Sequence, residues 1–235
     1  MLINPDSFPP ALTPSKQGAD WWLPRHEEKL TLKDSMKSVD LVFLGDSITQ
    51  AWETKGATVW EAFYRPLNAL NLGFNGDRTE HVLWRIEHGA VDDIQPKLLL
   101  LSIGTNNTGH RQDTAEETAL GIQKILSLLQ QKLPYTSILL LAIFPRSAKP
   151  TQRMRRLNND INHIIQSYAD NAKIFYLDIN PIFLDQKGKL TRDIMEDFLH
   201  PNTDQYPIIA KALEPHVKTL MKTGYCHHSD RHKPR

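Results

Sequence analysis

The sequence is poor in cysteine, in long apolar runs and in net charge. Its 235 residues include one cysteine, Cys226, so an internal disulfide framework is excluded. The longest apolar runs, residues 98–101 and 138–144, are strand-sized, whereas a membrane-spanning helix needs about 20 residues. Lys and Arg total 28 against 27 Asp and Glu, which gives no general attraction for nucleic acid or an anionic membrane. We therefore expect no integral membrane segment, no nucleic-acid partner and a small-molecule substrate.

The sequence also lacks the common signatures of export and of cofactor binding. Residues 1–20 contain no basic stretch followed by an apolar one, so no signal peptide is expected. The default location is cytoplasmic, with a secreted or periplasmic location left open. No CxxC or HExxH pattern occurs, residues 73–79 fit neither a P-loop nor G-x-G-x-x-G, and the histidines of residues 227–232 have no partner segment with ligand spacing. We expect no metal and no cofactor.

Five short apolar runs alternate with amphipathic stretches along the chain. Residues 115–132 and 153–169 have apolar side chains at helical spacing. The apolar runs are continuous rather than alternating, which indicates strands buried on both faces of a parallel sheet. The expected strands are 41–44, 69–72, 97–103, 137–144 and 173–177. The pattern predicts an α/β fold, in which a five-stranded parallel sheet forms the middle of three α/β/α layers.

The ends of the chain differ in composition from its centre. Trp21 and Trp22 precede a charged stretch, which predicts either a short helix packed on the domain or a contact surface. The last helix is expected at 204–223, with a kink or a late start because it contains Pro207 and Pro215. The predicted parts are an N-terminal extension packed on the domain (1–37), one catalytic domain (38–223) and a polar disordered tail (224–235).

A candidate nucleophile, Ser47, follows the first apolar run in the sequence Gly45-Asp46-Ser47. The setting differs from the G-x-S-x-G elbow because Thr49 stands where that motif needs glycine. At the first turn of a helix, Ser47 would feel the positive end of the helix dipole, and its N–H could face an oxyanion. The alternative is that Ser47 merely caps this helix. For Asp46, a hydrogen bond that ties down the turn is favoured over catalysis.

A candidate base and its orienting acid lie just before the last helix. In Asp197-Phe198-Leu199-His200, a carboxylate and an imidazole are three residues apart, so one turn can present both. His200 would accept the Ser47 proton while Asp197 holds the other ring N–H. The alternative is a capping aspartate beside a surface histidine. Asp193 and Asp178 are alternative acids.

Donors for a developing oxyanion are expected from two further loops. Gly73, after the second predicted strand, could supply a backbone N–H, and Asn106, after the third, an amide group. Ser47 N–H would be the third donor. Because the carboxyl ends of parallel strands open on one rim, these loops are expected to meet there. The alternative is that both are ordinary turn residues.

Three other polar residues fall near the same predicted rim. His81, His110 and Arg146 could contact the leaving group of a substrate. The alternative is that all three are solvated surface side chains.

Four segments resemble, in order and spacing, the blocks of the SGNH (GDSL-type) hydrolase superfamily over residues 38–221. They are Gly45-Asp46-Ser47, Gly73, Gly104-Thr105-Asn106-Asn107 and Asp197-Phe198-Leu199-His200. Residues 71–85 and 104–107 look most like the platelet-activating-factor acetylhydrolase IB catalytic-subunit branch. Asn107 stands where the wider superfamily has aspartate, as in that branch. The resemblance implies a flavodoxin-like fold, metal-free ester hydrolysis, the roles argued above for Ser47, Gly73, Asn106, Asp197 and His200, and room for a homodimer.

Two hypotheses of different class follow. The first is a serine esterase that cleaves short-chain esters, with acetyl favoured, through an acyl-enzyme on Ser47. The second is a catalytically silent flavodoxin-like binding or assembly module with Trp21, Trp22 and Trp84 as its contact surface. Phosphoryl transfer is disfavoured because Ile48 occupies the place of the second aspartate in a D-x-D-x-T motif.

Overall fold

A five-stranded, fully parallel sheet forms the centre of the structure. The computed structural model describes residues 8–229. All four neighbouring strand pairs are parallel, and the strand order is β2-β1-β3-β4-β5. This is the flavodoxin-like order of a doubly wound sheet. The strands are β1 Leu41–Gly45, β2 Ala69–Gly73, β3 Leu98–Ser102, β4 Ser137–Leu141 and β5 Ile174–Leu177. The predicted α/β/α fold with a five-stranded parallel sheet is confirmed.

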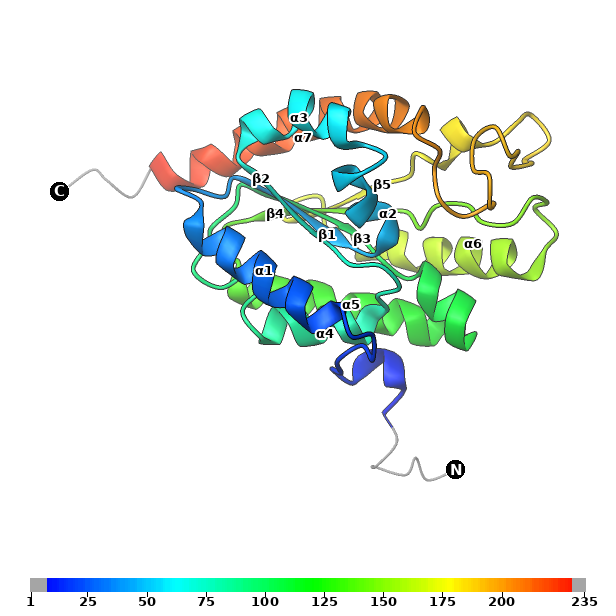
Figure 1. The fold of residues 1–235 in the computed structure, drawn as a ribbon, viewed down its shortest axis with the longest axis horizontal. Coiled ribbons are helices and arrows are strands. Elements are labelled where there is room, and N and C mark those ends of the chain that lie inside the picture. The colour runs from blue at the N-terminus through cyan, green and yellow to red at the C-terminus, as the bar shows by residue number, and fades with distance from the viewer. Residues whose placement is uncertain (1–7, 230–235) are drawn as a thin grey trace.

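Helices cover both faces of the sheet (Figure 1). Alternate side chains of β1 point to opposite faces, so Val42 and Leu44 belong to one apolar core and Leu41 and Phe43 to the other. Helices α4, α5 and α6 cover the first core, and α3 and α7 cover the second. The helices are α1 Trp22–Ser35, α2 Ser47–Gln50, α3 Ala57–Phe63, α4 Thr79–Glu87, α5 Ala115–Lys132, α6 Arg153–Ile165 and α7 Gln205–Ser229.

Helix α5 begins and ends where its sequence pattern predicts. The Thr114 hydroxyl accepts from the Glu117 N–H, and the Glu117 carboxylate accepts from the Thr114 N–H, which forms a capping box. Ile122, Ile125 and Leu129 are fully buried on one stripe of the helix. Burial of each of these side chains contributes roughly 2 kcal/mol, so packing against the sheet holds the helix in place.

The last helix accommodates both of its prolines. Pro207 lies in the first turn of α7, where a backbone N–H has no partner within the helix, and Pro215 lies in its interior. The helix continues to Ser229, beyond the predicted end at 223. Residues 230–235, and all side chains from residue 223 onward, lie outside the described part of the chain, and with them Cys226 and the tail histidines.

The N-terminal segment, residues 8–35, lies on the same side of the sheet as α4 (Figure 1). Trp22 is fully buried and packs against Phe74 and Trp84, which is itself 9% exposed. Trp21 is 41% exposed. The contact surface of Trp21, Trp22 and Trp84 in the alternative binding-module hypothesis was wrong, because Trp22 and Trp84 form an internal cluster. Within residues 8–229, no helix combines the length and the apolar character needed to cross a membrane.

Candidate active site

Ser47 is the first residue of α2 and not its cap. Asp46 provides the cap, because its side chain accepts from the Ile48 N–H at 3.0 Å. The Ser47 N–H therefore faces the open end of the helix without an intrahelical acceptor. Asp46 is 2% exposed, and burial raises the pKa of its carboxyl to about 7. Asp46 ties down the turn as expected, and this leaves the Ser47 hydroxyl free for other contacts.

A chain of two hydrogen-bond contacts joins Ser47, His200 and Asp197. Ser47 Oγ lies 2.9 Å from His200 Nε2, and His200 Nδ1 lies 2.6 Å from Asp197 Oδ2. The other Asp197 oxygen accepts from the backbone N–H groups of Leu199 and His200. Burial pushes the pKa of Asp197 upward, but these hydrogen bonds outweigh burial and hold it below its usual value. Asp197 therefore stays ionised beside the imidazole.

The alternative acids make other contacts. Asp178 accepts from the Asn180 N–H, and the Asp193 carbonyl accepts from the side chain of Asn202. Within the described residues, Asp197 is the carboxylate that contacts His200. The sequence spacing of three residues is what permits this contact within one turn.

The turn that carries Asp197 and His200 is held by a loop from the end of β4. Phe198 has a φ of +58°, a left-handed conformation that is costly for an aromatic residue, and its carbonyl accepts from the Ser147 N–H at 2.9 Å. Arg155, which is 2% exposed, donates to the carbonyls of Arg146, Ser147 and Gly188. Sequence reasoning missed Arg155, because an arginine among the other arginines at the start of α6 gives no signal of such burial.

Gly73 packs against the nucleophile helix and has no free N–H. A Cβ at this position would lie 2.1 Å from the backbone nitrogen of Gln50 in α2, so only glycine fits. The Gly73 N–H donates to Asn71 Oδ1 at 2.8 Å, and the Gly73 carbonyl accepts two bonds from Arg25. In this structure the Gly73 N–H is therefore not available to an oxyanion, contrary to the expectation from sequence.

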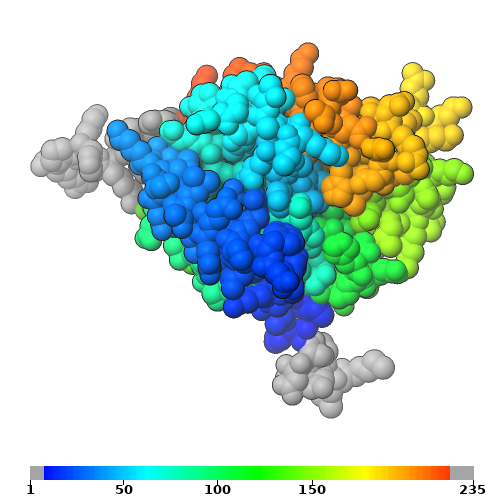
Figure 2. Space-filling view, in the orientation of Figure 1, coloured from blue at the N-terminus to red at the C-terminus, as the bar shows by residue number. Residues whose placement is uncertain are grey.

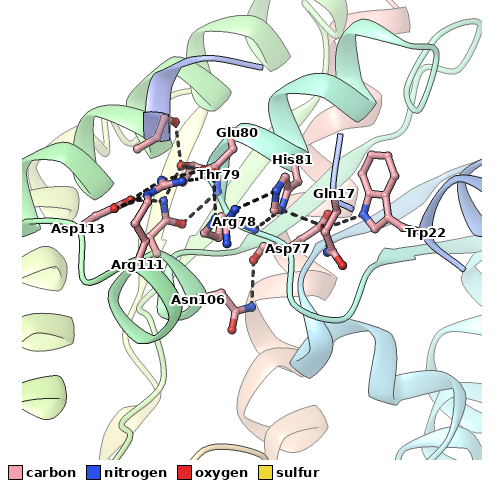
Figure 3. Close-up of polar contacts among 12 residues, drawn as sticks. Gln17, Trp22, Asp77, Arg78, Thr79, Glu80, His81, Asn106, Arg111 and Asp113 are labelled. Carbon is pink, nitrogen blue, oxygen red and sulfur yellow. Dashed lines mark hydrogen bonds and ion pairs between the residues drawn. The ribbon is translucent and has the colours of Figure 1, made fainter. Parts of the chain in front are cut away.

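A different glycine, Gly76, lies in the loop that contacts Asn106. The Asn106 side-chain amide donates one N–H to the Asp77 carbonyl at 3.0 Å and keeps a second N–H (Figure 3). Gly76 precedes Asp77, has a φ of +73°, and its N–H has no acceptor among the described residues. Sequence reasoning passed over Gly76, although a glycine directly before an aspartate in this loop was visible.

The three predicted substrate contacts occupy different environments. His81 is 2% exposed, its Nδ1 accepts from the Arg78 N–H, and burial lowers its pKa to about 4. His110 is exposed and lies near Gly76. Arg146 is half-buried, donates to the Thr105 carbonyl at 2.8 Å and feels the charges of Asp46 and Asp197. The structure places His110 and Arg146 near the loops of the site and His81 inside the fold.

Asn107, the residue that departs from the wider superfamily pattern, has a structural contact. Its side chain accepts from the Thr79 N–H at the start of α4 and donates to Asp113. Asn107 therefore links the loop after β3 to the helix after β2, and does not compete with Asn106.

Comparison with known proteins finds similar lipases and esterases. Residues 43–208 match the model of the GDSL-like Lipase/Acylhydrolase family. The chain is 34% identical over 220 residues to platelet-activating factor acetylhydrolase IB subunit alpha2 from Rattus norvegicus, which covers 93% of each sequence. A solved GDSL-like lipase from Bacteroides thetaiotaomicron aligns with a TM-score of 0.69 at 17% identity, over 83% of this chain and 97% of that one. An acetylxylan esterase from Geobacillus stearothermophilus aligns with a TM-score of 0.61 at 18% identity, over 79% and 96%.

Proposed function

Because the chain belongs to the GDSL-like lipase/acylhydrolase family, it is a carboxylic ester hydrolase, and from this premise we propose that it cleaves short-chain esters, acetyl esters above all, through an acyl-enzyme on Ser47. The observation that carries the proposal is the Ser47–His200–Asp197 chain of contacts at 2.9 and 2.6 Å. This is the arrangement of nucleophile, base and orienting acid that acyl transfer needs.

In the first half of the reaction, Ser47 Oγ attacks the ester carbonyl while His200 Nε2 accepts the hydroxyl proton. Asp197 accepts from His200 Nδ1–H, so it fixes the ring tautomer and stabilises the imidazolium. The C–O bond to the alcohol then breaks, and His200 returns the proton to the leaving alkoxide. In the second half, His200 takes a proton from water, and the resulting hydroxide attacks the acyl carbon. The bond between this carbon and Ser47 Oγ then breaks, His200 returns the proton to Oγ, and the carboxylic acid is released.

The oxyanion is proposed to be held by three donors: Ser47 N–H, Gly76 N–H and the free amide N–H of Asn106. Gly76 replaces Gly73 in this role, because the Gly73 N–H already donates to Asn71. Asn106 and Gly76 are coupled, since Asn106 donates to the carbonyl of Asp77, the next residue along. Loss of one such donor costs about 3 kcal/mol of transition-state stabilisation.

The preference for acetyl rests on the similar proteins. One relative bears the name acetylhydrolase and one structural neighbour the name acetylxylan esterase, and their alcohol groups differ. The acyl group is therefore the part of the substrate that we carry over. A panel of p-nitrophenyl esters from acetate to octanoate tests this, and kcat/KM should be highest for acetate. A higher kcat/KM for butyrate or longer chains would contradict the acetyl assignment.

The test of the nucleophile is covalent labelling. A fluorophosphonate should add one adduct mass to Ser47 and stop hydrolysis of p-nitrophenyl acetate. Ser47→Ala should abolish both, while Ser127→Ala, which changes an exposed serine of α5, should leave both unchanged. If wild-type protein is neither labelled nor active on any ester of the panel, the binding-module hypothesis replaces this proposal.

A further inference from the structure

The loop between β2 and α4 contains one proposed oxyanion donor, Gly76, and contacts a second one, Asn106. Gly76 would supply an N–H, and the Asp77 carbonyl fixes the side chain of Asn106 at 3.0 Å. The position of this loop therefore sets where two of the three donors lie. Within the loop, the Asp77 N–H donates to the Phe74 carbonyl at 3.1 Å, whereas Gly76 has a left-handed φ and no side chain to pack.

The side chain of Asp77 anchors the loop to the interior of the protein. It is fully buried, and its two oxygens accept from Trp22 and Gln17 (Figure 3) and from Arg85 on the other side. Arg85 lies on α4, but Gln17 and Trp22 belong to the N-terminal segment. The Trp22 Nε1–H contact is 2.7 Å long, and Gln17 Nε2 donates to Asp77 Oδ1 and also to the Asn75 carbonyl. Two residues of the N-terminal segment thus hold the loop on both sides of Gly76.

The same segment also holds the end of β2. Arg25 of α1 donates from Nε and from Nη2 to the Gly73 carbonyl, at 3.1 and 3.0 Å. Its guanidinium pairs with Glu53, which follows α2. The N-terminal segment, residues 8–35, therefore contacts both the loop between β2 and α4 and Gly73 at the end of β2, which packs against α2. In Figure 2 it appears in blue, spread over the surface beside the cyan residues that follow β1.

We propose that the N-terminal segment is a positioning element of the oxyanion site, acting through Trp22 and Gln17 on Asp77 and thereby on Gly76 and Asn106. The inference rests on the proposed function. It goes beyond the family match, which begins at residue 43 and leaves this segment out. Trp22, Gln17 and Arg25 touch no reacting atom, so they are positioning residues and not catalytic ones.

The consequence is kinetic. A misplacement of about 1 Å in a catalytic group can cost 100-fold in rate, while the ground-state substrate, which does not yet carry the oxyanion, is bound almost as before. Loss of the hydrogen bonds from Trp22 and Gln17 to Asp77 should therefore lower kcat and leave KM nearly unchanged. A general loss of folded protein would instead reduce the number of active sites.

The test uses Trp22→Phe and Gln17→Ala in the full-length protein, with p-nitrophenyl acetate as substrate. Trp22→Phe keeps an aromatic ring but removes the indole N–H, and Gln17 is half-buried, so its truncation does not open the core. The matched control is Lys33→Met, because Lys33 also anchors α1, but to the Asp92 carbonyl and not to the loop. Fluorophosphonate titration counts competent sites, and thermal unfolding checks the fold.

We expect kcat per titrated site to fall about tenfold or more in Trp22→Phe and Gln17→Ala, with KM within twofold of wild type. The inhibition constant of an alkyl boronic acid, which forms a tetrahedral adduct on the serine, should rise by the same factor as kcat falls. Lys33→Met should stay within twofold in both measurements.

Two results would overturn the inference. One is a kcat per titrated site within twofold of wild type in both Trp22→Phe and Gln17→Ala. The other is an equal loss in Lys33→Met, which would mean that α1 acts only through general stability. Failure of the proposed function looks different, because wild-type protein would then neither hydrolyse the ester nor react with the fluorophosphonate.

Discussion

Ser47 Oγ lies 2.9 Å from His200 Nε2, although the two residues are 153 positions apart in the sequence. The contact follows from the parallel sheet, in which β1 lies between β2 and β3 and the segment before α7 returns over the same rim. Because both residues lie at turns at the ends of elements, the fold fixes their backbones, and the third residue, Asp197, fixes the ring of the histidine.

Asp197→Asn should lower kcat/KM by about 10³ to 10⁴ while the protein stays folded. The asparagine oxygen can still accept the backbone N–H groups of Leu199 and His200, but its NH₂ group cannot accept from His200 Nδ1–H. The imidazole would then be held in the wrong tautomer. Asp193→Asn is the matched control, and steady-state kinetics with thermal unfolding distinguish the two. Similar activities of the two variants would contradict the assignment of Asp197.

Gly73→Ala and Gly76→Ala should differ in stability. At Gly73 a Cβ meets the backbone of Gln50 at 2.1 Å, so we expect a loss of about 3 kcal/mol or more in the free energy of unfolding. At Gly76 a Cβ would be 3.6 Å or more from its neighbours, and the cost is that of the positive φ, about 1 kcal/mol. Urea unfolding measures both. Equal losses would show that α2 does not pack closely on β2.

The strands, the long helix α5 and the Ser47, Asp197 and His200 positions could be predicted because each depends on a local pattern. A strand run, a capping box and a three-residue spacing are all visible in the sequence. The role of Gly73 was not visible, because a glycine that admits a ligand and a glycine that admits a neighbouring helix look alike. Which of the two applies depends on Gln50, which is distant in sequence.

The burial of Trp22 and Arg155 could not be predicted from the sequence, for a related reason. Trp22 precedes a charged stretch, so the sequence left both packing on the domain and a contact surface open; the side chain is buried on Phe74 and bonded to Asp77. No pattern in the sequence singled out Arg155, which donates to three carbonyls. In each case, the burial depends on polar partners in another part of the chain, and hydrophobic periodicity carries no information about them.

Asp46 should make folding stability depend on pH. Burial raises its pKa to about 7 in the folded state, against 3.8 for an ordinary aspartate, so folding takes up a proton between these values. Its contribution is therefore full below pH 3.8 and is lost as the pH rises through 7. Relative to Asp46→Asn, wild-type protein should gain about 1.4 kcal/mol between pH 8 and pH 6.

The comparison with Asp46→Asn is needed because buried histidines act in the opposite direction. The pKa of His81 is lowered to about 4, so acidification below 6.5 favours protonation in the unfolded state. The asparagine can keep the cap on Ile48 and isolates the carboxyl. Urea unfolding at pH 8 and pH 6 provides the measurement. A difference between the two proteins that does not change with pH would show that Asp46 is ionised throughout.

Arg155→Met should weaken the turn that carries the catalytic acid and base. The substitution leaves the carbonyls of Arg146, Ser147 and Gly188 without their donor, and each buried unpaired carbonyl costs about 1 to 3 kcal/mol. The loop is also what bonds Phe198, through the Ser147 N–H, so its loosening should lower kcat as well as stability.

Arg153→Met is the matched control for Arg155→Met, because Arg153 lies on the same helix with an exposed side chain. We expect the control to change the free energy of unfolding by less than about 0.5 kcal/mol. Arg155→Lys separates the two effects of Arg155, since one ammonium can satisfy one or two of the carbonyls but cannot span all three. It should recover part of the stability and less of the kcat, because a carbonyl left without its donor loosens the loop that bonds Phe198. Full activity in Arg155→Met would mean that Asp197 and His200 hold their geometry without the loop.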